Sequence, residues 1–205
     1  EIAKRLEQLG AGYLAVSNID ECEELRDSGV TLPILMLGFT PADQTARILQ
    51  LHMTQAVQSY DIAKEFSDRA VALGGKMTVH IKLDTGMHRL GFNPREDMDR
   101  LIDRLQHQNA VIPRSVFSHF VGSDSDSFDD FSARQFALFD EGSRRLQSAF
   151  SHHILRHIDN SAGIEHFPER QLDMCRLGLG LYGINSRNNA IINTVSTLKT
   201  TILQL

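Results

Sequence analysis

The sequence has few cysteines and no long apolar run, and each shortage excludes a class of protein. Cys22 and Cys175 are the two cysteines among 205 residues, and their separation fits no spacing of metal ligands. Reduced thiols are the default in the cytosol, so the cytoplasm is the expected location. No apolar stretch approaches the roughly 20 residues of a membrane-spanning helix, so no membrane partner is expected.

Basic charge, metal-binding clusters and linkers are scarce as well. The formal net charge is -5 and the pI is about 6.0, so the sequence offers no basic surface for nucleic acid. We find no acidic cluster that suggests a divalent metal, and no flexible linker or internal repeat divides the chain. The chain shows neither a starting methionine nor a signal peptide, and both ends look cut from something longer.

What the sequence does contain is a regular alternation of short apolar segments and helical patterns. The apolar segments predict seven strands, near residues 13, 33, 54, 78, 115, 155 and 174. Between them, Asn18 with Glu21 and Asn93 with Pro94 are typical starts of helices. Strands that alternate with helices imply a parallel sheet covered by helices, with function at the carboxyl ends of the strands. An open doubly wound sheet places ligands there too. Seven units and a start inside a helix suggest an eight-stranded α/β barrel that lacks its first strand.

The stretch from residue 78 to residue 92 has the most unusual pattern. Val79 and Ile81 are apolar, whereas His80 and Lys82 are polar, so one face of this strand is polar. The strand breaks at a glycine, and Arg89 follows soon after. The plain interpretation is a half-exposed strand with a surface turn. The alternative is a strand whose polar face lines a functional site.

Four clusters of chemically capable residues follow the strands. The clusters are Lys82 and Asp84 with Arg89, His119 with Ser123 and Asp124, Asn160 with Ser161, and Arg176 with Gly178 and Leu179. Each alone has an ordinary explanation, such as a structural histidine, a helix cap or a salt bridge at the rim. Together they suit a phosphorylated, planar, anionic cofactor. A serine hydroxyl and backbone N–H groups near glycines bind phosphate, and arginine supplies charge that cannot be lost.

Four of these segments resemble the signatures of bacterial alanine racemases, in the same order. They are residues 80–92, 118–120, 159–162 and 176–183. The resemblance implies a pyridoxal 5'-phosphate enzyme of fold type III, with an α/β barrel followed by a β-rich domain, that acts as a homodimer. It implies the interconversion of L-alanine and D-alanine for peptidoglycan. Residues 1–184 would then be the barrel, incomplete at its start, and residues 185–205 the linker and first strand of the second domain.

The same resemblance implies roles for the residues that would surround the cofactor ring. Arg176 would face the pyridine nitrogen and, by staying protonated itself, would keep that nitrogen largely unprotonated. His119 would pack against the ring. Arg89 would reach the phenolic oxygen and the substrate. Lys82 matches a lysine that is carbamylated in many members, which would turn its repulsion of Arg89 into attraction.

The resemblance also places the phosphate and shows what the sequence does not contain. Asn160 and Ser161, with the backbone of Gly178 and Leu179, would bind the phosphate group. The family's cofactor-linking lysine and its catalytic tyrosine, the two bases that act on opposite faces of the substrate Cα, are not found in these residues. His88 occupies a position where the family often has a small residue.

Three alternatives stay open within this fold. The first is a racemase of serine or of broad specificity. The second is a decarboxylase of fold type III, although such enzymes usually place an acid where Arg176 stands. The third is a pyridoxal-phosphate-binding protein without catalytic activity.

Overall fold

Six parallel strands form one sheet, in the order in which they occur along the chain. The computed structural model describes residues 1–185, 192–193 and 195. The strands of that part are β1 (Leu14–Val16), β2 (Ile34–Met36), β3 (Met53–Val57), β4 (Met77–Lys82), β5 (Val111–Phe117) and β6 (Leu155–His157). Sequential parallel neighbours joined by helices are the connectivity of an α/β barrel.

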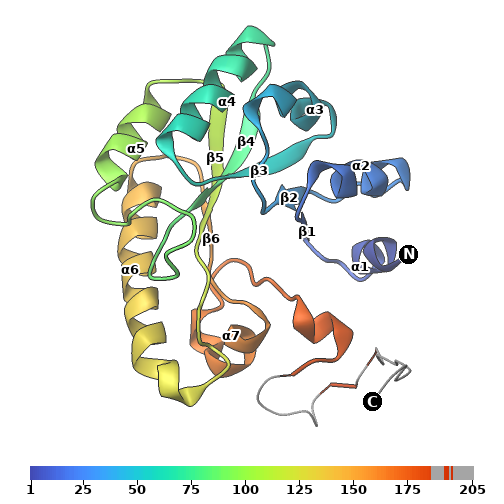
Figure 1. The fold of residues 1–205 in the computed structure, drawn as a ribbon, viewed down its shortest axis with the longest axis vertical. Coiled ribbons are helices and arrows are strands. Elements are labelled where there is room, and N and C mark those ends of the chain that lie inside the picture. Colours follow the sequence, from blue (N-terminus) through green and yellow to red (C-terminus); the bar gives the residue numbers. More distant parts are fainter. Residues whose placement is uncertain (186–191, 194, 196–205) are drawn as a thin grey trace, which may run out of the picture.

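Helices connect the strands and cover the outer face of the curved sheet (Figure 1). The α-helices of the described residues are α1 (Ile2–Gln8), α2 (Ile19–Asp27), α3 (Thr45–Gln50), α4 (Tyr60–Ala72), α5 (Met98–Gln106), α6 (Asp129–Ser148) and α7 (Ser161–His166). Short 3-10 helices add η1 (Ala42–Gln44), η2 (Asp126–Phe128), η3 (Pro168–Arg170) and η4 (Leu179–Tyr182). None of the described helices is long and apolar enough to cross a membrane.

The two faces of the sheet bury different kinds of side chain. Val79, Ile81 and Val116 point outward and join the large apolar core between the sheet and the helices. The inner face carries a small apolar cluster of its own, built on Leu35 and Phe117. The period-two pattern of β4 therefore separates an outer apolar face from an inner polar one. His80 is fully buried and Lys82 is 9% exposed, so the plain interpretation of this strand as half exposed is wrong.

Local capping signals predict two helix starts, and the structure confirms one of them. The side chain of Asn18 accepts a hydrogen bond from the backbone N–H of Glu21, which confirms the predicted start of α2. The predicted helix start at Asn93 and Pro94 is wrong, because α5 begins only at Met98. The Asn93 side chain instead accepts hydrogen bonds from the backbone within a turn over residues 93–97.

The strand predicted near residue 174 is also absent from the described part of the chain. This segment runs beside β6 and is joined to it by two backbone hydrogen bonds, from Asp173 N to Arg156 O and from Arg176 N to Asp159 O. Leu172, just before it, has a φ of 51°, so the chain enters the segment from a turn. Two separated bonds do not make a strand ladder. They nevertheless fix where Arg176 lies.

β5 contains an irregularity that matters for the interior. Val79 of β4 pairs with Pro113, but the next residue, His80, pairs with Ser115. Arg114 is therefore an extra residue in β5, and it is exposed. Proline has no N–H to give to the ladder, so a bulge beside it costs little pairing. The predicted strand at 115–120 starts earlier, at Val111, and ends at Phe117, which leaves His119 in the following loop.

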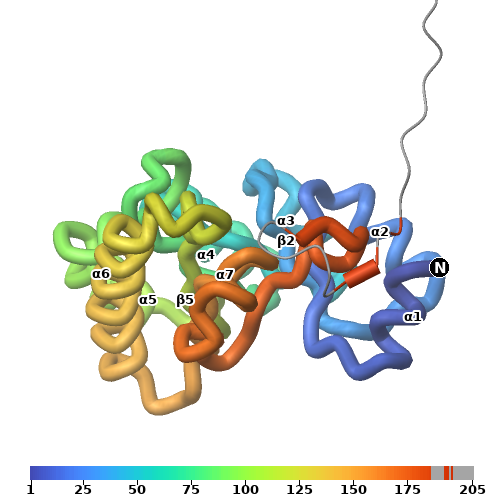
Figure 2. The backbone as a smooth tube through the Cα atoms, turned by 90° about the horizontal axis from the view of Figure 1, so that it is seen from below, coloured from blue at the N-terminus to red at the C-terminus, as the bar shows by residue number. Residues whose placement is uncertain are grey.

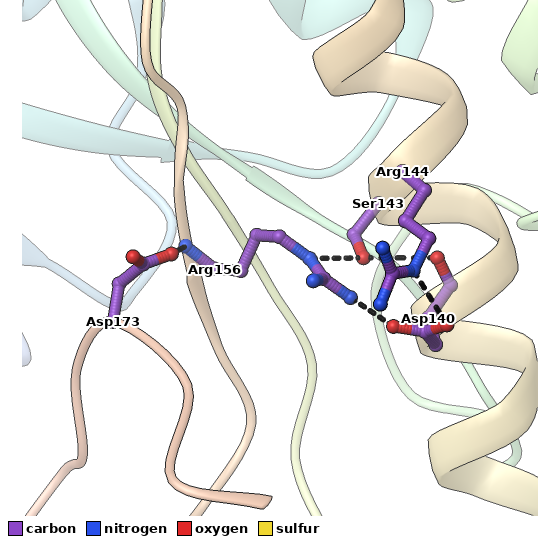
Figure 3. A network of polar contacts seen from close by, with 5 residues as sticks. All are labelled: Asp140, Ser143, Arg144, Arg156 and Asp173. Atoms are coloured by element: carbon purple, nitrogen blue, oxygen red, sulfur yellow. Dashed lines mark hydrogen bonds and ion pairs between the residues drawn. The ribbon is translucent and has the colours of Figure 1, made fainter.

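Polar contacts tie β6 to the longest helix and to the segment that follows it (Figure 3). Arg156 forms an ion pair with Asp140 and donates a hydrogen bond from Nε to Ser143 Oγ of α6 at 2.9 Å. The backbone N–H of Arg156 donates to the carboxylate of Asp173 at 2.8 Å. Since neighbouring residues of a strand point to opposite faces, Arg156 points outward and His157 points inward.

The predicted linker and first strand of the second domain, residues 185–205, cannot be compared with the structure, because most of residues 186–205 lie outside the described residues. The division into a barrel of residues 1–184 and a second domain from 185 stays a prediction.

Candidate functional site

A cavity of about 600 Å³ opens at the carboxyl ends of the strands. Its walls come from residues at or just after the ends of β1, β2, β4 and β5, and from the loops after β5 and β6. Residues 175–183, which follow β6 and α7, curve back toward β1 and α1 (Figures 1 and 2). The cavity is thus closed on one side by a segment that is distant in sequence.

Lys82 and Arg89 come from β4 and from the loop after it. The loop turns back on itself, with backbone hydrogen bonds joining Phe92 N to Lys82 O and Asp84 N to Phe92 O. The Asp84 carboxylate accepts the N–H groups of Gly86 and His88, both at 3.0 Å, so it holds the turn. Both Lys82 and Arg89 line the cavity. Burial lowers the pKa of Lys82, and the nearby charges of Arg89 and Arg176 lower it further.

Arg176 has the densest set of contacts in the site. Its Nη1 donates to His157 Nδ1 at 2.6 Å, and its Nη2 donates to the carbonyl oxygens of Ser118 at 2.6 Å and Ile158 at 2.9 Å. No described residue accepts a hydrogen bond from its Nε, and the residue lines the cavity. Burial lowers the pKa of Arg176 to about 10, so the guanidinium remains charged at pH 7 and can only donate.

His119 lies beside Arg176 on the cavity wall. Arg176 Nη2, which donates to Ser118 O and Ile158 O, also lies 3.2 Å from His119 Nδ1. Burial and the charge of Arg176 lower the pKa of His119 to about 4. The loop that carries it is held by Gln135 of α6, which donates to His119 O and accepts from Val121 N. His119 is therefore a neutral ring in a fixed position at pH 7.

The predicted phosphate-binding residues come together on the other side of the cavity. Ser161 Oγ accepts hydrogen bonds from the backbone N–H groups of Gly178 at 2.9 Å and Gly180 at 3.2 Å. Asn160 is the N-cap of α7, where its side chain accepts from Gly163 N, and it also accepts from Ser123 Oγ at 2.8 Å. Asn160 thus has the structural role of a cap and lines the cavity at the same time.

Positive charge dominates the inner part of this cavity. Lys82, Arg89 and Arg176 all line it, and no ion pair among the described residues involves any of them. Asp124 and Glu165 also line the cavity, and both are exposed to solvent, as is Arg89; Lys82 and Arg176 are the cations of its inner part. Three cations without a partner in a partly enclosed space repel one another, and an anionic ligand would relieve that repulsion.

Sequence reasoning assigned no individual role to the residues behind the cavity, although it placed His80 on a polar face of its strand. His80 on β4, Ser115 on β5 and His157 on β6 are fully buried, and they connect to one another and to Arg176. Alternation along β6 places His157 on the inner face, and the same test places His80 there, so the signal for two of them was present. Ser115 could not be placed from the sequence, because the bulge in β5 decides which way it points.

A buried acid lies close to the phosphate-binding residues and was also missed. Asp159 is fully buried, and neither of its carboxylate oxygens has a hydrogen-bond partner among the described residues. Burial raises its pKa to about 7, although Arg176 and Arg170 act in the opposite direction. The sequence also suggested no set of metal ligands, whereas the structure brings Asp126, Asp129 and His166 within 4.8 Å of one another.

Parallel β/α units that curve around a cationic cavity at the carboxyl ends of the strands define an α/β-barrel protein with a site for an anionic ligand. The chain belongs to the alanine racemase family, because residues 1–186 match the family described as "Alanine racemase, N-terminal domain". The predicted family and the predicted barrel-type fold are thereby confirmed.

Individual relatives agree with this assignment. The chain is 34% identical to "Alanine racemase 1" of Oceanobacillus iheyensis, covering 89% of this chain and 48% of that protein. It is 35% identical to an alanine racemase of Clostridium perfringens, covering 98% of this chain and 53% of that protein. The solved structure of alanine racemase from Clostridium difficile 630 has a TM-score of 0.85 at 35% identity, over 92% of this chain and 49% of that one. The chain thus spans about half the length of the relatives that it matches.

A second kind of racemase has a similar fold. A histidine racemase from Leuconostoc mesenteroides superimposes with a TM-score of 0.80 at 28% identity, over 91% of this chain and 49% of that one. The fold alone therefore does not choose the amino acid.

Proposed function

We propose that the protein that contains this chain is an alanine racemase dependent on pyridoxal 5'-phosphate. The observation that carries the proposal is the cavity with three cations that have no ion-pair partner among the described residues. The cofactor brings a phosphate and a phenolate, which are the charges that this cavity needs. When bound, it supplies an electron sink that makes the Cα proton of an amino acid acidic.

The residues present fit this cofactor through their donor groups. Arg176 has a charged donor at Nε that no described residue uses, and an unprotonated pyridine nitrogen is a matching acceptor. An arginine that stays charged also prevents that nitrogen from gaining a proton, which moderates the electron demand of the ring. This argument disfavours a decarboxylase of the same fold.

The other residues position the ligand. His119 offers a neutral ring surface for packing, because its pKa is lowered to about 4. Ser161 and the N–H groups of Gly178 and Leu179 would hold the phosphate, and Asn160 fixes the loop that carries Ser161. Arg89 would neutralise the phenolic oxygen and the substrate carboxylate. Carbamylation of Lys82 would turn its repulsion of Arg89 into attraction; the lowered pKa of Lys82 supports it, because carbamylation requires the free amine.

A homodimer is part of the proposal. Four apolar side chains border the cavities on this side of the molecule and are 37–62% exposed: Leu177, Leu179, Leu181 and Tyr182. Exposed apolar side chains that gather beside a site are typical of a surface covered by another domain. We propose that the partner subunit covers this surface and that D-alanine for peptidoglycan is the product.

Isotope exchange tests the function directly. The full-length protein with pyridoxal 5'-phosphate should exchange the Cα proton of L-alanine in deuterated water and form D-alanine. Serine and histidine should be offered in parallel, because a racemase of another amino acid is the main competitor. If the protein binds the cofactor and exchanges the Cα proton of none of the three, the racemase proposal is wrong.

A further inference from the structure

Three buried side chains connect Arg176 to the interior of the sheet. His157, Ser115 and His80 are each 0% exposed and come from the adjacent strands β6, β5 and β4. None of the three lines the cavity. Their contacts run in sequence: Arg176 Nη1 to His157 Nδ1 at 2.6 Å, His157 Nε2 to Ser115 Oγ at 3.0 Å, and Ser115 Oγ to His80 Nδ1 at 2.5 Å.

The charge on Arg176 fixes the directions of the first two hydrogen bonds in this row. A guanidinium only donates, so His157 Nδ1 must accept and the ring proton of His157 is on Nε2. His157 Nε2–H then donates to Ser115 Oγ, whose own hydroxyl proton remains available to His80 Nδ1. When the hydroxyl donates there, His80 has its own ring proton on Nε2. If His157 were protonated on Nδ1 instead, two donors would face each other across 2.6 Å.

The row exists because of the irregularity in β5. With an unbroken register, Arg114 would stand opposite His80. The extra residue moves Ser115 into that place, and Ser115 then reaches His157 diagonally across the β5–β6 pair, in which it stands opposite Leu155. Bulges near active sites commonly redirect one side chain in this way.

The surroundings hold the two rings in place. The His157 ring stacks on Phe117 with centroids 5.0 Å apart and planes 2° apart. The His80 ring meets Tyr13 edge-on at 5.5 Å. His80 Nε2 has no hydrogen-bond partner among the described residues, so the row ends there. A row that ends inside the sheet does not carry protons to solvent; its effect is on the orientation of the first member.

We propose that Ser115 and His80 are positioning residues for Arg176. By accepting the proton of His157 Nε2, Ser115 keeps His157 in the one tautomer that can receive a hydrogen bond from Arg176, and His80 orients the serine hydroxyl. This holds the Arg176 guanidinium with Nε free to reach a ligand in the cavity. Only the expected effect on kcat rests on the proposed function. The tautomers of His157 and His80 do not depend on any cofactor.

The first test is the tautomeric state of the two histidines in the full-length protein. Labelling with 15N-histidine distinguishes protonated from unprotonated ring nitrogens, and single histidine-to-glutamine variants assign the signals. We expect both His80 and His157 to be neutral with the proton on Nε2 at pH 7, with and without pyridoxal 5'-phosphate. A proton on Nδ1 of His157 would overturn the proposal.

The second test separates positioning from general stability. Ser115→Ala removes the acceptor, Ser115→Thr keeps the hydroxyl, and Ser132→Ala removes a buried serine hydroxyl on α6 that has no hydrogen-bond partner among the described residues. We expect Ser115→Ala to populate the second tautomer of His157 and to lower kcat about three- to tenfold with KM nearly unchanged, the range of one lost hydrogen bond. Ser115→Thr should restore most of kcat, and Ser132→Ala should change neither the tautomers nor kcat.

The two tests can contradict the positioning role without contradicting the proposed function, and the reverse also holds. If the protein racemises no amino acid, the 15N signals and the response of His157 to Ser115→Ala still decide whether the row exists. If Ser115→Ala does not fold, the signals of the unmodified protein and the kcat of Ser115→Thr still decide. If the tautomers are as expected but Ser115→Ala has the kcat and spectrum of Ser132→Ala, the positioning role is wrong.

Discussion

The inner face of the sheet has two halves that differ in chemistry. Strands β1 to β3 present small or apolar side chains there, such as Ala15, Leu35 and Ala56. Strands β4 to β6 present polar side chains there. They are His80 and Lys82 of β4, Ser115 of β5 and His157 of β6. The two halves have the same secondary structure and the same parallel pairing, so backbone architecture does not explain the difference. Under the proposed function, the apolar half supports the cavity and the polar half contributes the groups that take part in the chemistry.

The polar half restricts the pH range in which the fold is stable. Burial lowers the pKa of His80 to about 3 and that of His119 to about 4, so below about pH 6.5 the unfolded chain binds protons at these rings and the folded chain does not. Folding stability therefore falls as the pH decreases through that range. Asp159 acts in the opposite sense, because its raised pKa means that the folded chain keeps a proton that the unfolded chain has lost. Stability from this group falls as the pH increases from about 4 to 7.

The largest expected effect separates the two halves most clearly. Arg176→Gln removes a charged donor and leaves the acceptor of His157 without its partner, so we expect racemisation to fall about 100- to 1000-fold. The absorption spectrum of bound pyridoxal 5'-phosphate should change as well, because the pyridine nitrogen would lose its cationic neighbour. Arg156→Gln is the matched control, since this arginine lies on the outer face of β6, in the network of Figure 3. An unchanged spectrum in Arg176→Gln would contradict the assigned role.

Truncating a side chain in the apolar half should lower the stability of the fold and leave the cofactor spectrum unchanged. Leu35 is 1% exposed and packs with Ala56 and Phe117. Leu35→Ala should lower the free energy of unfolding by about 2–4 kcal/mol through lost burial and an incompletely filled cavity. The cofactor spectrum should not change, because no charged or donor group is altered. Urea denaturation measures the first quantity, and Leu35→Met, which preserves volume, should cost less than about 1.5 kcal/mol. A shifted cofactor spectrum would mean that the apolar half also controls the chemistry.

Asp159→Asn tests the cost of the buried acid. The variant cannot ionise, so its stability relative to the unmodified protein should rise by about 2–3 kcal/mol between pH 5 and pH 8, because the folded protein keeps the Asp159 proton over the roughly two pH units below its raised pKa. Urea denaturation at the two pH values measures this difference. Asp124→Asn, at an exposed position on the cavity, is the control. A gain of equal size at both pH values would show that burial of a charge is not the cause.

The sequence was sufficient for the parts of the molecule that depend on local pattern. Alternation located all six strands, and the four strand-end clusters that it indicated do line one cavity. What it could not supply depends on geometry between segments. The bulge at Arg114 turns Ser115 inward, and no local pattern announces it. The segment carrying Arg176 looked like a strand because its apolar residues match one, but two backbone hydrogen bonds and a turn at Leu172 hold it instead.

The smallest expected effect lies at the start of α7, where the segment that carries Arg176 returns to Ser161. Ser161 Oγ accepts the N–H groups of both Gly178 and Gly180, so it holds the returning segment and also faces the proposed phosphate. Ser161→Ala should weaken the binding of pyridoxal 5'-phosphate about three- to tenfold, the range of one hydrogen bond, and change the absorption spectrum of the bound cofactor little. Equilibrium dialysis against the cofactor measures the affinity. Ser123→Ala is a matched control, because Ser123 Oγ donates to Asn160 and binds neither glycine. If Ser161→Ala alters the spectrum as much as Arg176→Gln does, the site does not divide into a part that holds the phosphate and a part that polarises the ring.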